Sequence, residues 1–315
     1  MKKNGVICID VGGTKISGSL FESPLSLSHP EPIKTMTHKT FKGRKGLKAS
    51  LTAMIDPLIE IALANEIEVH STLGLSFPGK HNHYLIEPGT ANNLALTDGD
   101  MDYCDVRSLV QHPVFNKIEI ENDAFCQLLG QMICSPREER TLTGYIGPGT
   151  GLGGGFAEIS NGKLSKISDG HIFDILLQTT TGIEEAEEYL SGRGIKRLFN
   201  KEAKELSEAD IKLNEHKVSE LTEMIIQLIR KLKSGEFNKS KRKNEWSESI
   251  KNKIKNTQHF YFGGSIGTKG PLHKAMIKKI TRKLKNSSLT QDIKITAIKK
   301  PELKAQLYLA QKIIG

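Results

Sequence analysis

Two glycine-rich segments contain residues that could bind a phosphate group. Residues 10–15 (DVGGTK) follow one short apolar run, and residues 149–155 (GTGLGGG) follow another. Glycines in a tight turn let backbone N–H groups approach an anion. Thr14 can add a hydroxyl donor, and Asp10 can hold a magnesium ion or a water bound to it. The first segment alone is equally typical of a plain hairpin turn, but a second such segment favours phosphate binding.

The second segment contains the pattern GxGxxG, which is typical of dinucleotide-binding folds. Asp169 also lies where such folds place an acidic residue that binds ribose. That motif requires a helix to begin within the glycines. Here residues 156–160 and 163–164 flank Asn161-Gly162, a pair that predicts a β-hairpin instead. We therefore expect two glycine hairpins that hold the phosphates of one nucleotide from two sides.

A carboxylate follows a third apolar run. Residues 114–120 predict a strand, and Asn122-Asp123 precede a helical segment over residues 124–132. Both residues are strong helix caps, which is a purely structural interpretation. Phosphoryl transfer to a hydroxyl also needs one acceptor for the hydroxyl proton, and a carboxylate at a helix start beside an asparagine could supply it. The phosphate-binding segments favour this chemical role for Asp123.

The elements that would position these residues alternate between strands and helices, which predicts an α/β fold with two lobes. We place the N-terminal lobe at residues 1–121, completed by the C-terminal helix 301–315. The C-terminal lobe is placed at residues 122–300, with a lysine-rich insertion at about residues 233–256. Pro57 is expected to kink or restart the first helix. Strands are predicted over residues 5–10, 16–22, 71–79, 114–120, 141–146, 259–262 and 292–298, and helices over residues 46–65, 124–132, 184–199, 218–232, 272–285 and 301–315.

Positive charge is concentrated in two C-terminal segments. The 315-residue chain carries 45 Lys and Arg against 36 Asp and Glu, a net charge of +9. Residues 229–256 hold ten basic and three acidic residues, and residues 274–300 hold nine basic and one acidic, so the remainder is net negative. We interpret both segments as solvated surface. Nucleic-acid binding is the alternative, weakened because Phe237 and Trp246 are the only interleaved aromatic residues of the first segment.

Cysteine usage and hydropathy exclude several other classes of protein. The four cysteines, Cys8, Cys104, Cys126 and Cys134, form no CxxC pair and no metal-like spacing, so neither a disulfide framework nor a zinc site is expected. No run of about 18 apolar residues predicts a membrane span, and the N-terminus has no apolar core of signal-peptide length. We therefore expect a cytoplasmic protein without a membrane partner.

Several short motifs follow one another along the chain. They are Asp10-Val11-Gly12-Gly13-Thr14-Lys15, Pro78-Gly79, Asn93-Leu94, Glu121-Asn122-Asp123-Ala124, Gly149-Thr150-Gly151-Leu152-Gly153-Gly154-Gly155, Asn161-Gly162-Lys163-Leu164, Glu187-Glu188-Tyr189-Leu190-Ser191-Gly192 and Gly263-Gly264-Ser265. Taken in this order, the motifs resemble those of the sugar kinases of the ROK family, which include bacterial glucokinases, N-acetylglucosamine kinases and N-acetylmannosamine kinases. The resemblance runs from residue 5 to about residue 267, and YLSGRG at residues 189–194 is most similar to the N-acetylglucosamine kinases.

The resemblance implies a two-domain, actin-like ATPase (ribonuclease H-like) fold with a central cleft. It implies a kinase that uses ATP and Mg²⁺ to phosphorylate the 6-hydroxyl of a hexose or N-acetylhexosamine of the glucose, N-acetylglucosamine or N-acetylmannosamine class, and a homodimer. Asp123 matches the catalytic base, and Asp10 would hold the Mg²⁺, directly or through water. The sugar-binding residues would be Asn93, Asn122, His171 and Glu187. The nucleotide would be bound by Asp10, Gly12, Gly13, Thr14, Lys15, Gly149, Thr150 and Gly151, with Gly263 and Gly264 on the adenosine side.

Two departures from the family pattern fall on the sugar side. The family has a longer loop that ends in GExGH, whereas residues 165–171 read SKISDGH, with Ser168 or Asp169 in place of the glutamate and His171 retained. The zinc-binding cysteine cluster of the family is replaced by residues 178–186. His171 could be only a hydrogen-bonded structural residue, and Glu187 could lie on a solvated helix face. A second function therefore stays open, namely a sugar- or nucleotide-sensing protein on the same fold with little or no turnover.

Overall fold

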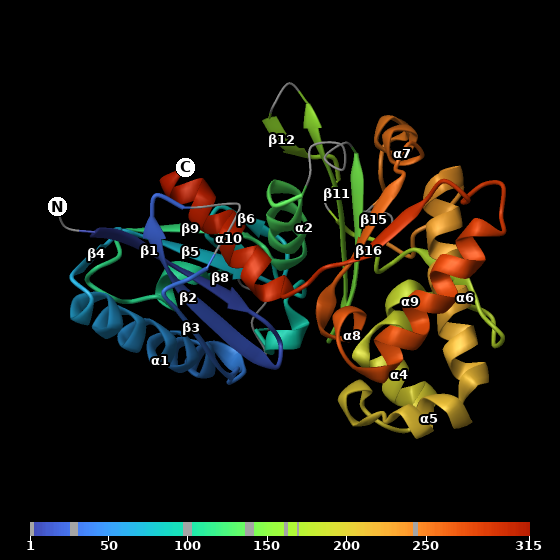
Figure 1. Cartoon of the computed structure of the whole chain (residues 1–315), viewed down its shortest axis with the longest axis horizontal. Helices are drawn as coiled ribbons and strands as arrows, with labels where there is room; N and C mark the ends of the chain where they lie inside the picture. Colours follow the sequence, from blue (N-terminus) through green and yellow to red (C-terminus); the bar gives the residue numbers. More distant parts are fainter. Residues whose placement is uncertain are drawn as a thin grey trace. The chain divides into compact units, whose positions relative to one another are not determined.

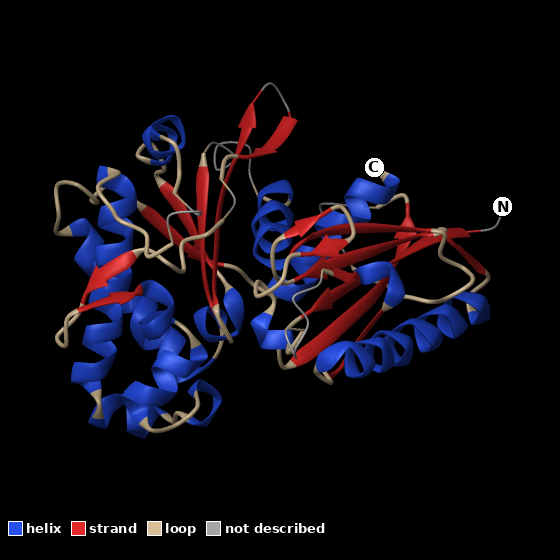
Figure 2. Cartoon of the chain, turned by 180° about the vertical axis from the view of Figure 1, so that it is seen from behind, coloured by secondary structure: helices blue, strands red, loops and turns tan. Residues whose placement is uncertain are grey.

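The chain forms two compact units. The computed structural model describes residues 3–25, 31–96, 103–135, 142–160, 163–168, 170–241 and 245–315. Unit 1 comprises residues 1–134 and 302–315, and unit 2 comprises residues 135–301. Each combines a sheet with helices (Figure 2). The boundary differs from the one expected at residues 121 and 122, because helix α2 (Asp123–Ile133) packs in unit 1, where Gly130 lies against the backbone of Lys304.

The sheet of unit 1 combines parallel strands with an antiparallel hairpin. Across the sheet the order is β3 (Lys34–Lys39), β2 (Lys15–Ser23), β1 (Lys3–Val11), β5 (Thr72–Phe77) and β9 (Lys117–Asn122), and β4 (Ile67–Val69) pairs in parallel with β1. β1 and β2 pair antiparallel through the first glycine turn, whereas β1, β5 and β9 run parallel. The carboxyl ends of β1, β5 and β9 therefore lie at one edge of the sheet.

Helices cover both faces of this sheet, as Figure 1 shows for α1 (Gly43–Ala64) and α10 (Pro301–Ile314). Ile7 and Ile9 of β1 belong to the hydrophobic cluster that includes α1, while Val6 and Cys8 belong to the cluster that includes α10. Successive residues of a strand point to opposite faces, so a strand covered on both sides is apolar throughout. α1 runs through Pro57 as one helix, so the expected restart at that residue is wrong.

Short elements complete unit 1. β6 (His81–Asn82), β7 (Leu85–Ile86) and β8 (Cys104–Asp105) form a small antiparallel sheet. Two 3-10 helices, η1 (Asn92–Leu94) and η2 (Val106–Ser108), lie before and after β8 in the chain.

The sheet of unit 2 repeats the strand order of unit 1. β10 (Thr143–Pro148) and β11 (Leu152–Ser160) pair antiparallel through the second glycine turn, and β10, β15 (His259–Phe262) and β16 (Lys294–Ala297) run parallel. No helix begins within the GxGxxG segment because residues 152–160 form a strand, which confirms the hairpin prediction against the dinucleotide-binding fold. Asn161, Gly162 and Asp169 lie outside the described residues. The order is β12 (Lys163–Lys166), β11 (Leu152–Ser160), β10 (Thr143–Pro148), β15 (His259–Phe262) and β16 (Lys294–Ala297).

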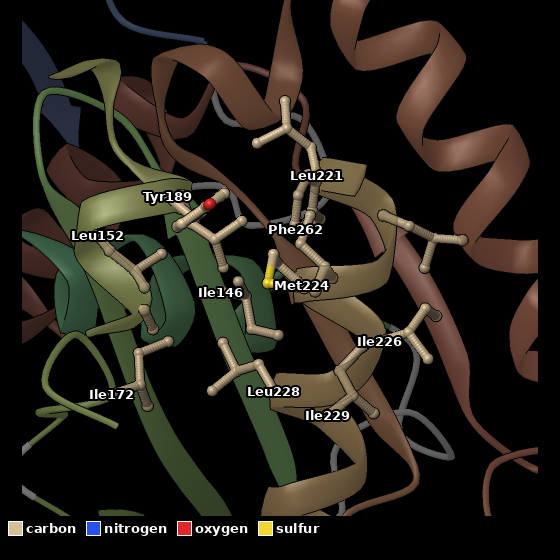
Figure 3. Packing of buried hydrophobic residues seen from close by; sticks show 14 of the residues in the cluster. Ile146, Leu152, Ile172, Tyr189, Leu221, Met224, Ile226, Leu228, Ile229 and Phe262 are labelled. Carbon is tan, nitrogen blue, oxygen red and sulfur yellow. The ribbon is translucent and has the colours of Figure 1, made fainter. Parts of the chain in front are cut away.

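The core of unit 2 lies between its sheet and two long helices, α6 (Glu215–Ser234) and α9 (Gly270–Lys285). Figure 3 shows Leu228 and Met224 of α6 beside Ile146 of β10. The other elements of unit 2 are the hairpin of β13 (Leu176–Gln178) and β14 (Ile183–Glu185), and α3 (Ala186–Leu190), α4 (Gly192–Phe199), η4 (Ala203–Glu205), α5 (Glu208–Leu213), α7 (Glu248–Ile254) and α8 (Gly264–Thr268).

Two expectations for unit 2 are wrong. Residues 184–199 do not form one helix, because Ser191 adopts an extended conformation that ends α3, and its hydroxyl caps α4 by accepting a hydrogen bond from Gly194 N (3.4 Å). The lysine-rich insertion is not simply solvated surface either, since Phe237, Lys239 and Trp246 are buried.

Within the described ranges, no helix is long and apolar enough to span a bilayer.

Candidate functional site

The first glycine turn is fixed between β1 and β2. Gly12 N donates to Lys15 O (2.9 Å). Thr40 holds the turn from outside, because its N–H donates to Thr14 O (3.1 Å) and its hydroxyl donates to Gly12 O (2.8 Å). The side chain of Thr14 is exposed. The turn therefore keeps its shape through its own contacts and presents a hydroxyl to solvent, as a phosphate-binding turn requires.

Two predicted sugar-binding asparagines lie in unit 1. A Cβ atom on Gly13 would lie 3.1 Å from Asn93 Cβ, so Asn93 packs against the first glycine turn. Asn122 Nδ2 donates to Gly79 O (3.1 Å), and Asn122 Oδ1 accepts from Ala124 N (3.0 Å). Asn122 therefore caps α2, as the structural interpretation expected, and also holds the Pro78-Gly79 turn.

Asp10 lies buried at the carboxyl end of β1, where the hydroxyl of Ser76 donates to its Oδ1. Desolvation by burial raises the pKa of Asp10 to about 8. The negative charges of Asp123 and Glu302 act in the same direction, while the Ser76 hydrogen bond and Lys15 oppose them. The carboxyl is therefore mainly protonated at neutral pH without a ligand, and a nearby cation would favour its ionised form.

The oxygen donors at this edge of the sheet suit a magnesium ion. Asp10 and Ser76 present a carboxylate and a hydroxyl, the hard donors that Mg²⁺ prefers. Among the described residues no group of three His, Cys, Asp or Glu side chains could hold a metal ion alone. Mg²⁺ commonly binds through one or two carboxylates together with substrate phosphates. The residues thus fit an ion that binds together with a phosphate ligand.

Asp123 follows β9 directly and begins α2. The parallel pairing of β1, β5 and β9 brings it to the edge of the sheet where Asp10 lies. Its Oδ1 accepts a hydrogen bond from Ala124 N (2.9 Å). Burial raises the pKa of Asp123 to about 6, against the opposing effect of the backbone N–H groups. A carboxylate with a pKa close to the working pH is well suited to accept a proton from a hydroxyl.

The second glycine turn, in unit 2, is closed by hydrogen bonds on both sides. Gly149 N donates to Gly151 O (2.8 Å), and Gly192 N, at the start of α4, donates to Gly149 O (2.7 Å). The motif SGRG at residues 191–194 therefore supports the turn that carries Thr150. The sequence predicted this motif as part of the family resemblance but did not predict that it supports the second glycine turn.

The predicted adenosine residues lie beside the same turn. Gly263 N donates to Ile146 O (2.9 Å). Gly264 has a φ of +70°, and a Cβ atom there would lie 2.3 Å from Pro148 O, so only glycine fits. Unit 2 thus brings together two motifs that are more than a hundred residues apart in the sequence, residues 149–151 and 263–264.

Glu187 does not lie on a solvated helix face. Its Oε2 accepts a hydrogen bond from Leu152 N (3.2 Å) and would lie 3.2 Å from a Cβ atom on Gly151. Burial raises the pKa of Glu187, with the Leu152 hydrogen bond opposing. Glu187 N donates to Phe173 O (3.0 Å), which ties α3 to the segment that carries His171.

His171 follows Gly170 (φ +80°) in the segment between β12 and β13. Its ring centroid lies 5.2 Å from that of Phe173, and its carbonyl oxygen accepts a hydrogen bond from Lys239 Nζ. Ser168, one of the two residues expected in place of the family's glutamate, is buried, and its Oγ accepts from Gly170 N (3.2 Å). The other, Asp169, lies outside the described residues.

Sequence reasoning missed three supporting residues. Ser76 is the one polar residue near the end of the apolar run 72–77, and this break in pattern could have identified it as a partner for Asp10. Thr40 and Lys239 have no comparable signal, because their roles depend on distant carbonyl and carboxylate groups.

Two α/β units with the same strand order, each with a glycine turn between its first two strands, define the actin-like ATPase fold. The sequence model of the ROK family matches residues 6–306, and the chain belongs to this family. A search of curated protein sequences found no match.

Solved structures with a similar fold include several sugar kinases. Lmo2764 from Listeria monocytogenes, described as a candidate N-acetylmannosamine kinase, superposes with a TM-score of 0.66 at 16% identity, over 98% of each chain. A ROK family glucokinase from Streptomyces griseus in complex with glucose and AMPPNP has a TM-score of 0.62 at 17% identity, over 98% of this chain and 99% of that one. A ROK family transcriptional regulator has a TM-score of 0.56 at 16% identity, over 98% of this chain and 78% of that one.

Proposed function

We propose that this protein is an ATP-dependent kinase that transfers the γ-phosphoryl group to the 6-hydroxyl of a hexose or N-acetylhexosamine. The observation that carries the proposal is Asp123, a carboxyl with a pKa of about 6 at the sheet edge that also holds Asp10 and the first glycine turn. The glucose and AMPPNP complex of the Streptomyces griseus glucokinase supports the same pair of ligands for this chain.

Each unit has a separate role in the proposed reaction. In unit 2, the glycine turn at residues 149–151 binds nucleotide phosphates, and the backbone at Gly263 and Gly264 lies on the adenosine side. In unit 1, Thr14 donates to a phosphate oxygen, and Asp10 holds the Mg²⁺, which neutralises phosphate charge when bound. Asp123 accepts the proton of the sugar 6-hydroxyl as that oxygen attacks the γ-phosphorus, and ADP leaves.

Four polar side chains are the proposed sugar-binding groups. Asn93 and Asn122 offer amide groups, and His171 and Glu187 offer an imidazole and a carboxylate that can bond to sugar hydroxyls. Asn122 already uses its Oδ1 to cap α2 and its Nδ2 on Gly79 O, so we expect it to contribute less to sugar affinity than Asn93.

The test is sugar-dependent release of ADP from Mg-ATP with glucose, N-acetylglucosamine, N-acetylmannosamine, mannose and fructose. Asp123→Asn keeps the acceptor oxygen for Ala124 N but removes the base, so kcat should fall by about 10²- to 10⁴-fold. Asp105→Asn is the matched control, because Asp105 is a carboxylate of the same unit that pairs with Arg107. No turnover with any sugar, or full activity in Asp123→Asn, would contradict the proposal.

A second function is favoured by the loss of the family's glutamate, in whose place Ser168 or Asp169 stands, and Ser168 is buried with its Oγ accepting from Gly170 N. With a weaker sugar subsite the protein would bind sugar or nucleotide as a sensor, with little turnover, and the similarity to a ROK family transcriptional regulator is compatible with such a role. Calorimetric titration of the same sugars separates the two functions: binding without ADP release identifies a sensor, and binding with release identifies a kinase.

A further inference from the structure

Lys239, which lies in the lysine-rich insertion, is buried in unit 2 with a carboxylate. The side chains of Lys239 and Asp174 are both fully buried, and Lys239 Nζ lies 3.0 Å from Asp174 Oδ1. The same ammonium group donates to His171 O and lies 4.3 Å from the centre of the Trp246 ring. A buried charge is tolerated only where such groups replace its hydration, so these contacts fix the ammonium at one point.

The backbone beside Lys239 holds the segment that carries His171. Residues 238–240 run antiparallel to residues 174–176, with a bridge between Lys239 and Ile175. Ser240 N donates to Asp174 O (2.9 Å), and Leu176 N donates to Asn238 O (2.9 Å). One side of the His171 segment is thus attached to the lysine-rich insertion by both backbone and side-chain bonds.

The other side of the same segment is attached to the start of α3. Ala186 N donates to Ile175 O (2.9 Å), and Glu187 N donates to Phe173 O (3.0 Å). Glu187 in turn accepts from Leu152 N at the second glycine turn. The two predicted sugar-binding residues of unit 2, His171 and Glu187, are therefore linked through residues 173–175, the stretch that Lys239 and Asp174 hold.

Apolar packing surrounds this attachment. Ile172, between His171 and Phe173, is fully buried, and Figure 3 shows it beside the strands of unit 2. Trp246 packs edge-on against Phe156 of β11, with ring centroids 5.9 Å apart. The surrounding apolar residues can therefore accommodate neutral side chains of similar size in place of Lys239 and Asp174. The hydrogen bonds of the pair are made to the His171 segment.

We propose that Lys239, paired with Asp174, is a positioning residue that sets the sugar affinity of the site by fixing His171 and, through residues 173–175, Glu187. The role of the pair as a determinant of sugar affinity rests on the proposed function. The part of the second glycine turn that we expect to bind phosphate, residues 149–151, is held by other bonds, from Gly149 N to Gly151 O and from Gly192 N to Gly149 O. Loss of the pair should therefore weaken sugar binding and leave nucleotide binding unchanged.

The decisive variant is Lys239→Met with Asp174→Asn, which removes both charges at nearly constant volume. We expect it to fold and to raise the sugar KM at least about tenfold, while the ATP KM stays within about twofold of wild type. Lys239→Arg retains the charge but not its position, and should give an intermediate sugar KM. Lys253→Met is the matched control, because that lysine is 53% exposed and pairs with Glu158; it should behave as wild type.

A folded double variant with an unchanged sugar KM would overturn the proposal, and so would equal increases in both KM values, which a general loss of structure produces. If the double variant does not fold, Lys239→Arg decides: a raised sugar KM with a normal ATP KM supports the positioning role, and an unchanged sugar KM overturns it.

Hydrogen exchange distinguishes failure of this inference from failure of the proposed function. The amides of Leu176, Ala186, Glu187 and Ser240 make the bonds described above. They should exchange at least about tenfold faster in the double variant, or in Lys239→Arg if the double variant does not fold, while amides of β10 keep the wild-type rate. Wild-type protein that phosphorylates no sugar would contradict the proposed function alone. Unchanged exchange at these amides would contradict the attachment whether or not the protein is a kinase.

Discussion

The carboxyl of Asp123 is expected to lower the stability of unit 1 at neutral pH, so Asp123→Asn should stabilise the fold while it removes the proposed base. The side chain of Asp123 is only partly exposed, and desolvation by burial raises the pKa of its carboxyl from the ordinary 3.8 to about 6. Asparagine has almost the same shape and can still accept a hydrogen bond from Ala124 N. It carries no charge that must be desolvated, which is the cause of the raised pKa.

The size of the effect and its dependence on pH follow from the two pKa values. Between about pH 4 and about pH 6 the folded state retains a proton on Asp123 that the unfolded state has lost, so the free energy of unfolding falls as the pH rises. A shift of about two units corresponds to about 3 kcal/mol. Residual exposure of Asp123 allows some solvent screening, so we expect Asp123→Asn to gain about 2 kcal/mol at pH 7 and almost nothing below about pH 4.

The two units can be followed separately in one experiment. Trp246 is the only tryptophan in the chain and lies in unit 2, so its fluorescence monitors that unit. Unfolding of unit 1 is followed by hydrogen exchange of the buried amides of β1 and β9 in urea. The gain should appear in unit 1 and not in the fluorescence of Trp246.

The control variant, Asp105→Asn, should change the stability at neutral pH in the opposite direction. Hydrogen bonding from the Arg107 side chain lowers the pKa of Asp105, so Asp105→Asn should lose stability at neutral pH instead of gaining it. A gain in Asp123→Asn that is equal at acid and neutral pH, or no gain at all, would refute the assignment of a buried, destabilising carboxyl.

Three further predictions concern Asp123, Gly130 and Gly264. If Asp123 is the base, log kcat/KM for the sugar should rise with slope one below about pH 6 and level off above it, and a profile that is flat through this range would contradict the role. Gly130→Ala should destabilise unit 1 by about 1 to 3 kcal/mol in urea unfolding, because the new Cβ would lie 1.8 Å from Lys304 O, while Trp246 fluorescence should show unit 2 unchanged. Gly264→Ala places a Cβ 2.3 Å from Pro148 O at a φ of +70°, so it should raise the ATP KM by roughly tenfold or more and leave sugar affinity, measured by calorimetry, unchanged.

The central strands and their glycine turns could be predicted because the relevant signals are local. The apolar run before Asp10 indicated a strand, and the glycines after it indicated the turn to β2. The same reasoning placed Asp123 at the start of a helix after a strand. Parallel pairing then brings these two residues to one edge without further information from the sequence.

The burial of Lys239 could not be predicted from its neighbourhood. A run of lysines indicates solvated surface, because a charged side chain is rarely buried without a partner. Here the partner, Asp174, is 65 residues earlier in the chain, and a third contact is the carbonyl oxygen of His171. Only the tertiary structure shows that the insertion containing Lys239 attaches to the segment that carries a candidate sugar ligand.

The repeated strand order explains why proton chemistry is assigned to unit 1. In unit 1, β1 and β5 place Asp10 opposite Ser76, a carboxyl beside a hydroxyl. In unit 2, the last paired residues of the corresponding strands β10 and β15 are Ile146 and Phe262, and each is followed in the chain by a glycine, Gly147 or Gly263. A Cβ atom on either glycine would lie 2.3 Å from an atom of the Tyr145 side chain.

The Tyr145 ring therefore occupies the space that side chains at these two glycines would need. Unit 2 lacks at these strand ends the paired carboxyl and hydroxyl groups of unit 1, and it offers backbone N–H groups close to the second glycine turn instead. Backbone N–H groups bind phosphate oxygens but cannot accept a proton. Within the described strands of the two sheets, the acid–base group of the proposed reaction must therefore come from the edge of unit 1 where Asp10 and Asp123 lie, and Asp123 has the pKa that suits the task.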